Sequence, residues 1–276
     1  MSHTIVHANG LAFHCLTWGD EADPLVLLVH GFPDTAHTWD IVGPLVAAAG
    51  FRVVAPNTRG IHPTEIPADG DYDSDTLGAD LLAIADALGR EEVILVGHDF
   101  GASAVYSAAG LFPDRVRKLV AMAIPHPAGL KPSPRILWGA RHFLGHRMPW
   151  AGWALRRNDF ARLRTLYERW SPAFDWPESA FAATKESYRH PGVAEASLAY
   201  YHFLSPNLPK GQRAKLPMPT LIVGGLTDGV CTEADFEKSR RRFTGPIDVA
   251  MVPGGHFLHN EHPEPFLEVL LPFLKG

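Results

Sequence analysis

The chain has few cysteines, no excess of basic charge and no long apolar run. Its two cysteines, Cys15 and Cys231, are too far apart in the sequence to indicate a C-x-x-C metal pair or a disulfide framework. The formal net charge of −5 argues against a nucleic-acid partner. No segment approaches the roughly 18 continuous apolar residues of a membrane span, and the amino terminus lacks the pattern of a signal peptide. We therefore expect a cytoplasmic protein with reduced, buried cysteines and with no nucleic-acid or membrane partner.

The sequence instead alternates short apolar runs with helical patterns. Runs such as PLVLLVHG, EEVILVGHD and PTLIVGGLTD are typical of strands that are buried on both faces. Helices are predicted between and after such runs, at these ranges: 39–49, 74–88, 101–111, 232–243 and 264–274. This order indicates an α/β fold with a mostly parallel sheet flanked by helices, preceded by a hairpin that turns at Asn9 and Gly10.

The alternation fails once, between residues 129 and 206. This segment is rich in Trp, Arg and Pro and contains helical patterns such as NDFARLRTLYERW, but no clear strand. We predict a core domain formed by residues 1–128 and 207–276, with a helical cap inserted at 129–206. Open α/β sheets bind ligands outside the carboxyl ends of their strands, so the cap is expected to cover the site there. The arginines of the cap are interpreted as a solvated helix face.

A candidate nucleophile lies in the stretch VGHDFGAS. The pattern resembles the G-x-S-x-G turn that carries a hydrolase nucleophile between a strand and a helix, but Asp99 stands where a serine is usual. Asp228 follows the run PTLIVGG and His256 follows VAMVPGG, so each lies just beyond an expected strand. A nucleophile, an acid and a histidine in this chain order are typical of a hydrolase triad. The alternative for Asp99 is an ordinary helix cap.

The histidines near the carboxyl terminus could also be taken for a metal cluster. His256, His259 and His262 recur at every third residue, whereas a zinc-binding helix requires i and i+4 spacing. Pro263 and Pro265 indicate a turn before the last helix. We therefore predict no metal and no cofactor, and we assign His259 and His262 to the surface or to packing.

Four motifs in combination resemble the epoxide hydrolase branch of the α/β-hydrolase fold. They are HGFP, GHDFG, AIPHP and PGGHF, and the resemblance covers essentially the whole chain. It implies an α/β-hydrolase fold and a cis peptide bond between Phe32 and Pro33. The oxyanion site is predicted to consist of the backbone N–H groups of Phe32 and Phe100, with both rings lining an apolar pocket.

A carboxylate nucleophile suits an sp³ carbon better than an acyl carbon. Asp99 would form an alkyl ester, which water activated by His256 and Asp228 would then hydrolyse. Epoxide opening and halide displacement both fit this scheme. Dehalogenases that this chain resembles carry arginines or a tryptophan after the nucleophile as halide donors, whereas Phe100 and Ser103 stand there. We therefore predict an epoxide hydrolase, with a hydrolytic dehalogenase and a non-catalytic ligand-binding protein as alternatives.

Epoxide opening leaves an alkoxide that an acid must protonate. The resemblance implies a cap tyrosine in a pattern like L-x-Y-Y-R, and SLAYYHFL matches it at Tyr201, with His202 in place of the arginine. The second acid of most relatives is another tyrosine. The stretch ARHFLGHRMP places His142 there, and His146 and Tyr167 are rival candidates.

The expected partners are a small apolar epoxide and water. The tryptophans of the cap are predicted to line an apolar pocket: Trp138, Trp150, Trp153 and Trp170. A homodimer is considered beside a monomer as the assembly.

Overall fold

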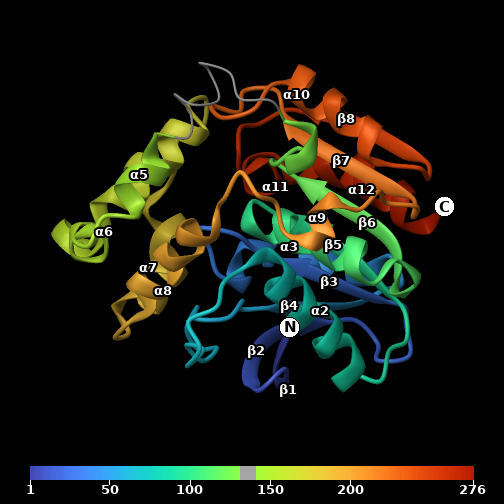
Figure 1. Cartoon of the computed structure of the whole chain (residues 1–276), viewed down its shortest axis with the longest axis horizontal. Coiled ribbons are helices and arrows are strands. Elements are labelled where there is room, and N and C mark those ends of the chain that lie inside the picture. The colour runs from blue at the N-terminus through green and yellow to red at the C-terminus, as the bar shows by residue number, and fades with distance from the viewer. Residues whose placement is uncertain (131–140) are drawn as a thin grey trace.

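The computed structural model describes residues 1–130 and 141–276, and its centre is an eight-stranded sheet (Figure 1). The strands follow the order β1-β2-β4-β3-β5-β6-β7-β8. Their bounds are β1 Ser2–Ala8, β2 Leu11–Trp18, β3 Leu25–Val29, β4 Arg52–Pro56, β5 Val93–His98, β6 Val116–Met122, β7 Thr220–Gly225 and β8 Ile247–Val252. β1 and β2 form the predicted hairpin, β2 pairs antiparallel with β4, and the other pairs are parallel. The predicted mostly parallel sheet is confirmed.

Helices connect and follow these strands. They are α1 Val42–Ala48, α2 Ser74–Ala87, α3 Phe100–Leu111, α5 His142–His146, α6 Ala151–Trp170, α7 Ala182–Arg189, α8 Val193–Ala199, α9 Lys210–Arg213, α10 Glu233–Glu237, α11 Leu258–Glu261 and α12 Pro263–Lys275. The helix predicted at 39–49 is divided, because its start belongs to a separate 3-10 helix, Ala36–Trp39, that Thr35 caps. The helix predicted at 232–243 is likewise α10 followed by a 3-10 helix, Lys238–Arg242.

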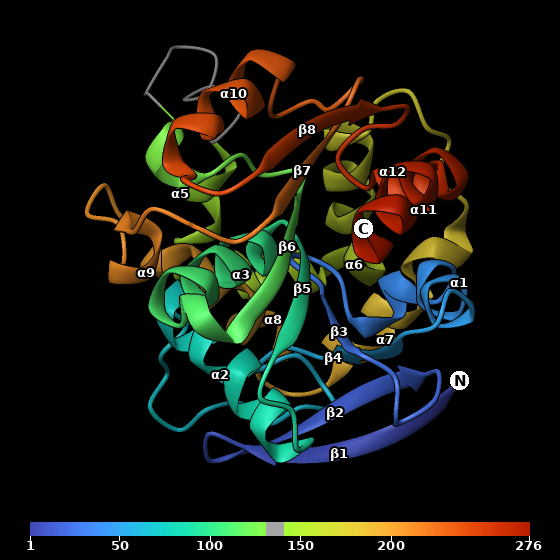
Figure 2. The ribbon, with the colours of Figure 1, turned by 90° about the vertical axis from the view of Figure 1, so that its right-hand side faces the viewer.

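The central strand β3 shows why the sequences of the strands are continuous apolar runs. Successive side chains of a strand point to opposite faces of the sheet. Leu25, Leu27 and Val29 pack in the cluster that contains α2 and α3, whereas Val26 and Leu28 pack in the cluster that contains α1 and α12. Figure 2 shows these helix pairs on opposite sides of the sheet. Both faces of β3 are therefore core, and no polar position is left to interrupt the run.

The helices α5 to α8 lie between β6 and β7 in the chain and are grouped on one side of the sheet (Figure 1). Their buried side chains, including Leu163 and Tyr188, join the same apolar cluster as α2 and α3 of the core. The proposed domain boundaries at residues 129 and 206 stay a prediction. Within the two described ranges, no helix is both long enough and apolar enough to cross a membrane.

Candidate active site

Asp99 lies at the turn between β5 and α3, where the sequence places the nucleophile. The turn is sharp enough to hold Asp99 at φ 53°, in the left-handed region that a non-glycine residue rarely adopts. A Cβ on Gly97 would lie 2.3 Å from the carbonyl oxygen of Gly101, which explains the glycine there. The side chain of Asp99 makes no capping hydrogen bond to α3. Asp99 therefore occupies the N-cap position of α3 without the side-chain hydrogen bond of an ordinary helix cap.

The loops after three strands bring Asp99, His256 and Asp228 together. Nε2 of His256 lies 3.4 Å from Oδ2 of Asp99, and its Nδ1 lies 3.1 Å from Oδ2 of Asp228. The other oxygen of Asp228 accepts hydrogen bonds from the backbone N–H groups of Val230 and Cys231, at 2.6 and 3.3 Å. The side chains of His256 and Asp228 are 2% and 0% exposed, against 14% for Asp99. The Asp99 carboxylate is therefore the member of this group that a ligand can reach.

The charges of these three side chains depend on one another. Burial by itself lowers the pKa of His256, but the charges and hydrogen bonds of Asp228 and Asp99 raise it to about 10. Burial also opposes ionisation of Asp99, yet the hydrogen bond and charge of His256 hold the pKa of this carboxyl below its usual value. Asp99 is thus an anion beside a protonated His256. Esterification of Asp99 would remove one negative charge, which favours release of the His256 proton.

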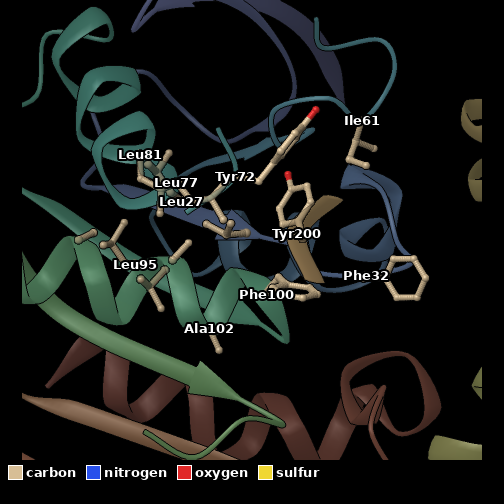
Figure 3. Close-up of a cluster of buried hydrophobic side chains, with 14 of the residues drawn as sticks. Leu27, Phe32, Ile61, Tyr72, Leu77, Leu81, Leu95, Phe100, Ala102 and Tyr200 are labelled. Carbon is tan, nitrogen blue, oxygen red and sulfur yellow. The ribbon is translucent and has the colours of Figure 1, made fainter. Parts of the chain in front are cut away.

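Two backbone N–H groups donate hydrogen bonds to the Asp99 carboxylate. The N–H of Phe32 donates to Oδ1 of Asp99 at 2.9 Å, and a backbone hydrogen bond from Phe100 contributes to the lowered pKa of Asp99. The bond between Phe32 and Pro33 is cis, as predicted. In Figure 3 the Phe100 ring lies next to Tyr200 of the cap, with ring centroids 5.3 Å apart. The two N–H groups predicted to stabilise an oxyanion thus meet at one carboxylate, under aromatic rings.

Tyr201 lies in the 3-10 helix Tyr200–Phe203, which follows α8. Its ring meets those of Phe32 and Phe100 edge to face, with centroids 5.2 and 5.0 Å apart. Burial and the nearby charge of Asp99 raise the pKa of Tyr201 well above its ordinary value, so its phenol keeps its proton. The neighbouring Tyr200 differs, because its hydroxyl donates to a core loop. Of the two adjacent tyrosines, Tyr200 is therefore engaged with the core through its hydroxyl, whereas Tyr201 packs its ring against Phe32 and Phe100.

The three candidates for a second acid are placed differently. The hydroxyl of Tyr167 donates to the buried carboxylate of Asp34, so Tyr167 is not available to a ligand and this rival is set aside. The His146 ring lies 4.6 Å from Tyr201, and burial together with nearby positive charges lowers its pKa to about 3. The His142 ring lies 5.9 Å from Tyr201 and 5.3 Å from His146. The structure thus brings both histidines to Tyr201.

The sequence reasoning missed the residues that hold the His256 loop. Nε2 of His98 donates to the carbonyl oxygen of His256 at 2.9 Å. Glu261 accepts hydrogen bonds from the N–H groups of the two residues that flank His256, at 2.7 and 3.0 Å. Ser171, which follows α6 of the cap, accepts from the N–H of His256 at 3.0 Å. Only His98 had a sequence signal, its position directly before the nucleophile.

Asp34 is a second missed carboxylate, and it directly follows the HGFP motif. Burial raises the pKa of Asp34 to about 6, although hydrogen bonds from Tyr167 and Thr38 favour its ionised form. One ligand-type atom each of Asp34, His98 and His259 lie within 4.8 Å of one another. Asp34 and His259 share the Thr38 hydroxyl, at 2.9 and 2.8 Å, and we interpret the group as a hydrogen-bonded network. His259 is buried, which agrees with its predicted packing role.

The predicted tryptophan lining is correct only in part. Trp170 is buried, and its ring lies 5.2 Å from that of His256. Trp150 and Trp153 are exposed instead, because the first turn of α6 directs its small residues inward, so the prediction is wrong for both. Trp138 lies outside the described residues.

Comparison with known proteins agrees with this geometry. Residues 24–263 match the family model described as the alpha/beta hydrolase fold. The AB hydrolase superfamily protein YfhM of Bacillus subtilis is 29% identical over 98% of this chain and 97% of its own. Epoxide hydrolase A of Mycobacterium tuberculosis is 27% identical over 99% and 97% of the two chains. The solved structure of epoxide hydrolase A from Mycobacterium thermoresistibile matches with a TM-score of 0.80 at 26% identity, covering 100% of this chain and 98% of that one. The predicted fold and the predicted resemblance are confirmed.

Proposed function

This chain belongs to the alpha/beta hydrolase fold family, and we propose that within the family it is an epoxide hydrolase that works through an ester on Asp99. One observation carries the proposal. The carboxylate of Asp99 stands at the nucleophile position, with the N–H of Phe32 at one oxygen and Nε2 of His256 at the other. The names of the relatives support the same class of reaction.

The first half of the proposed reaction forms the ester. An oxygen of Asp99 attacks a carbon of the oxirane, the carbon–oxygen bond of the ring breaks, and the released alkoxide takes a proton from Tyr201. His142 is proposed as the second donor to the same oxygen, with His146 as its rival. Because the rings around Asp99 are aromatic, a small apolar epoxide is the proposed substrate.

The second half releases a vicinal diol. Once Asp99 is an ester, His256 loses one of the charges that hold its proton and releases that proton, while a proton returns to the phenolate of Tyr201. The neutral His256 ring, oriented by Asp228, can then accept a proton from water. The resulting hydroxide attacks the ester carbonyl. The backbone N–H groups of Phe32 and Phe100 stabilise the oxyanion that forms there. Collapse of this intermediate breaks the bond between the ester carbon and the diol oxygen, which takes the proton of the added hydroxide. Asp99 returns to a carboxylate that keeps one oxygen atom from the water.

The proposed mechanism can be tested by following the oxygen atom of the water. A single turnover in heavy-oxygen water should label Asp99 rather than the diol, as read by peptide mass spectrometry. The His256→Gln variant should accumulate the ester, visible as a mass increase of the intact protein equal to the mass of the epoxide. Heavy oxygen that enters the diol directly in the first turnover would contradict the proposal.

The dehalogenase alternative predicts a different product. Halide release from haloalkanes or haloacids, with no diol from styrene-type, aliphatic or terpene epoxides, would move the assignment to halide displacement. No side-chain N–H stands at Phe100 to receive a halide, which is why we expect diols. The binding-protein alternative predicts ligand affinity with no product in either panel.

A further inference from the structure

The outer end of the cap carries an apolar surface that the proposed reaction does not use. Leu144, Met148, Trp150 and Trp153 are 68%, 37%, 60% and 58% exposed. They belong to α5, the turn after it and the start of α6, which Figure 1 shows on the side of the molecule away from the sheet. Helical spacing by three brings Trp150 near Trp153, and Met148 follows the end of α5, which carries Leu144. We call these four residues the cap patch.

The cap patch differs from the other exposed apolar side chains of the described residues. Those others lie singly or in pairs, such as Ile41 with Leu45 at α1, as is ordinary for a protein surface. The cap patch instead gathers four large side chains, including two tryptophans, within ten residues of chain. Exposed apolar patches of this kind mark contact sites, and tryptophan prefers the boundary between water and lipid.

Arginines are frequent in the part of the chain that carries the cap patch. Residues 141–170 contain seven arginines and only two carboxylates, in a chain whose net charge is −5. The guanidinium of Arg157 lies over the ring of Trp153, 4.7 Å from its centre. Burial and the like charges of Arg141 and Arg162 lower the pKa of Arg169, near the end of α6. Arg156 and Arg164 form exposed salt bridges with Glu195 and Glu178, which agrees with the predicted solvated face, whereas Arg157 lies against Trp153 of the cap patch.

The positive charge of the arginines distinguishes two possible binding partners of the cap patch, a second copy of this chain and a surface of anionic lipids. A symmetric dimer through the cap patch would place the same surface of each copy opposite itself and would therefore bring arginines against arginines. A surface of anionic lipids offers phosphates to the arginines and an apolar boundary to the tryptophans. The lipid surface therefore complements both the apolar side chains and the arginines, whereas a second copy of the chain complements only the apolar side chains.

We propose that the cap patch binds this protein to the surface of anionic membranes. Trp150 and Trp153 enter the headgroup region, and the arginines around them contact lipid phosphates. The contact is peripheral and needs no spanning segment. Because α5 also carries His142 and His146, docking holds the helices that line the site at the membrane, where apolar molecules concentrate. The expectation from sequence that no membrane partner exists is thereby revised.

Vesicle sedimentation tests the proposal. The protein should sediment with vesicles of phosphatidylcholine that contain about 30% phosphatidylglycerol, less with pure phosphatidylcholine, and less at high salt because salt screens charge. The Trp150→Ser/Trp153→Ser variant should lose about tenfold or more of this binding, and Arg157→Gln should lose a smaller part. The matched control is Leu45→Ser, at an apolar residue on α1 of the core that is 46% exposed, and this variant should bind as the parent does.

Three outcomes contradict the proposal. The first is no sedimentation of the parent protein with anionic vesicles. The second is an equal loss of binding in Leu45→Ser and in the double tryptophan variant. The third is a concentration-dependent dimer in light scattering that the double tryptophan variant abolishes, without vesicle binding, which would assign the cap patch to a second copy. Diol formation and circular dichroism spectra should be unchanged in the double tryptophan variant, because both side chains are exposed.

Discussion

The two sides of the candidate site are built in different ways. On the core side, Asp99, Asp228 and His256 each stand within a few residues of a strand end and are tied to one another by hydrogen bonds. On the cap side, Tyr201 and His146 meet through ring packing, 4.6 Å between centroids, across separate helices. Parallel strands align their carboxyl ends in one sheet, so the core side is positioned by backbone pairing. The cap side is positioned by ring packing and by a hydrogen bond from Arg147 to the carbonyl oxygen of Tyr201, at 2.7 Å.

The two sides also differ in charge. The core side holds an ion pair, because each carboxylate stabilises the protonated form of His256 and raises its pKa to about 10. The cap side holds groups in their neutral forms, because burial raises the pKa of Tyr201 and lowers that of His146. This division suits a reaction in which the core forms and cleaves an ester while the cap donates protons to the leaving oxygen.

The largest expected effect comes from removing the nucleophile on the core side. Asp99→Ala should lower the rate of diol formation by at least about 10⁴-fold, because neither half-reaction can proceed without the carboxylate. Asp114→Ala, which removes an exposed carboxylate, is the matched control and should keep the parent rate. Substantial turnover in Asp99→Ala would mean that the core side is not the reaction centre.

Neutralising the buried partner of His256 should have the next largest effect. Asp228→Asn removes the charge that contributes most to the raised pKa of His256, so this pKa should fall well below about 10 in a nuclear magnetic resonance titration. Ester hydrolysis in single turnovers should slow by about 10²-fold or more, because the ring loses its orienting partner. An unchanged titration would show that Asp228 does not determine the charge of His256.

The same pair has a signature in stability. A histidine whose pKa is raised on folding stabilises the fold below its unfolded pKa, near 6.5, and this contribution is lost as the pH rises through about 10. The free energy of unfolding should therefore decline between these values in the parent, measured by urea denaturation. The decline should be shallower in Asp228→Asn. An equal decline in both proteins would place its cause elsewhere.

On the cap side, two adjacent tyrosines allow a matched comparison. Tyr201→Phe should slow ester formation by about 10²-fold, because the alkoxide loses its acid while the ring packing stays. Tyr200→Phe should leave this rate within about threefold and should instead cost about 1 kcal/mol of stability, because its hydroxyl bonds to Thr58 and to the carbonyl of Arg59. Rapid-quench measurements of the ester decide between them. Equal effects would remove Tyr201 from its proposed role.

The smallest effect separates the two cap histidines. His142→Phe should slow ester formation about tenfold, since it loses the second donor but keeps an aromatic ring. His146→Phe should change this rate less and should mainly alter packing against Phe32 and Tyr201. The reverse order would assign the second donor to His146.

Local patterns made the core side predictable. The strands, the hairpin at Asn9 and Gly10, and the positions of Asp99, Asp228 and His256 follow from short apolar runs and from the residues directly after them. The cap was less predictable. The orientation of Trp150 and Trp153 depends on which face of α6 packs inward, and no short pattern states this.

The supporting residues were hidden from the sequence for the same reason. Ser171 and Glu261 lie far apart in the chain, yet both hold the backbone around His256, and their hydroxyl and carboxylate are 2.6 Å apart. Asp34 receives its hydrogen bond from Tyr167 of the cap. Hydrogen-bond partners of this kind are determined by how the cap packs on the core, and that packing depends on the shapes of both surfaces.

The sequence by itself determined the chemistry that the site can support, because the identity of Asp99 and the chain order of its partners lie in short motifs. It also determined the layered architecture, because strand and helix periods are local. Only the tertiary structure decided which cap side chains face Asp99, which hydroxyls are already occupied and which tryptophans reach solvent. These arrangements depend on contacts between segments distant in the chain, and the energies of those contacts arise only when the cap packs against the core.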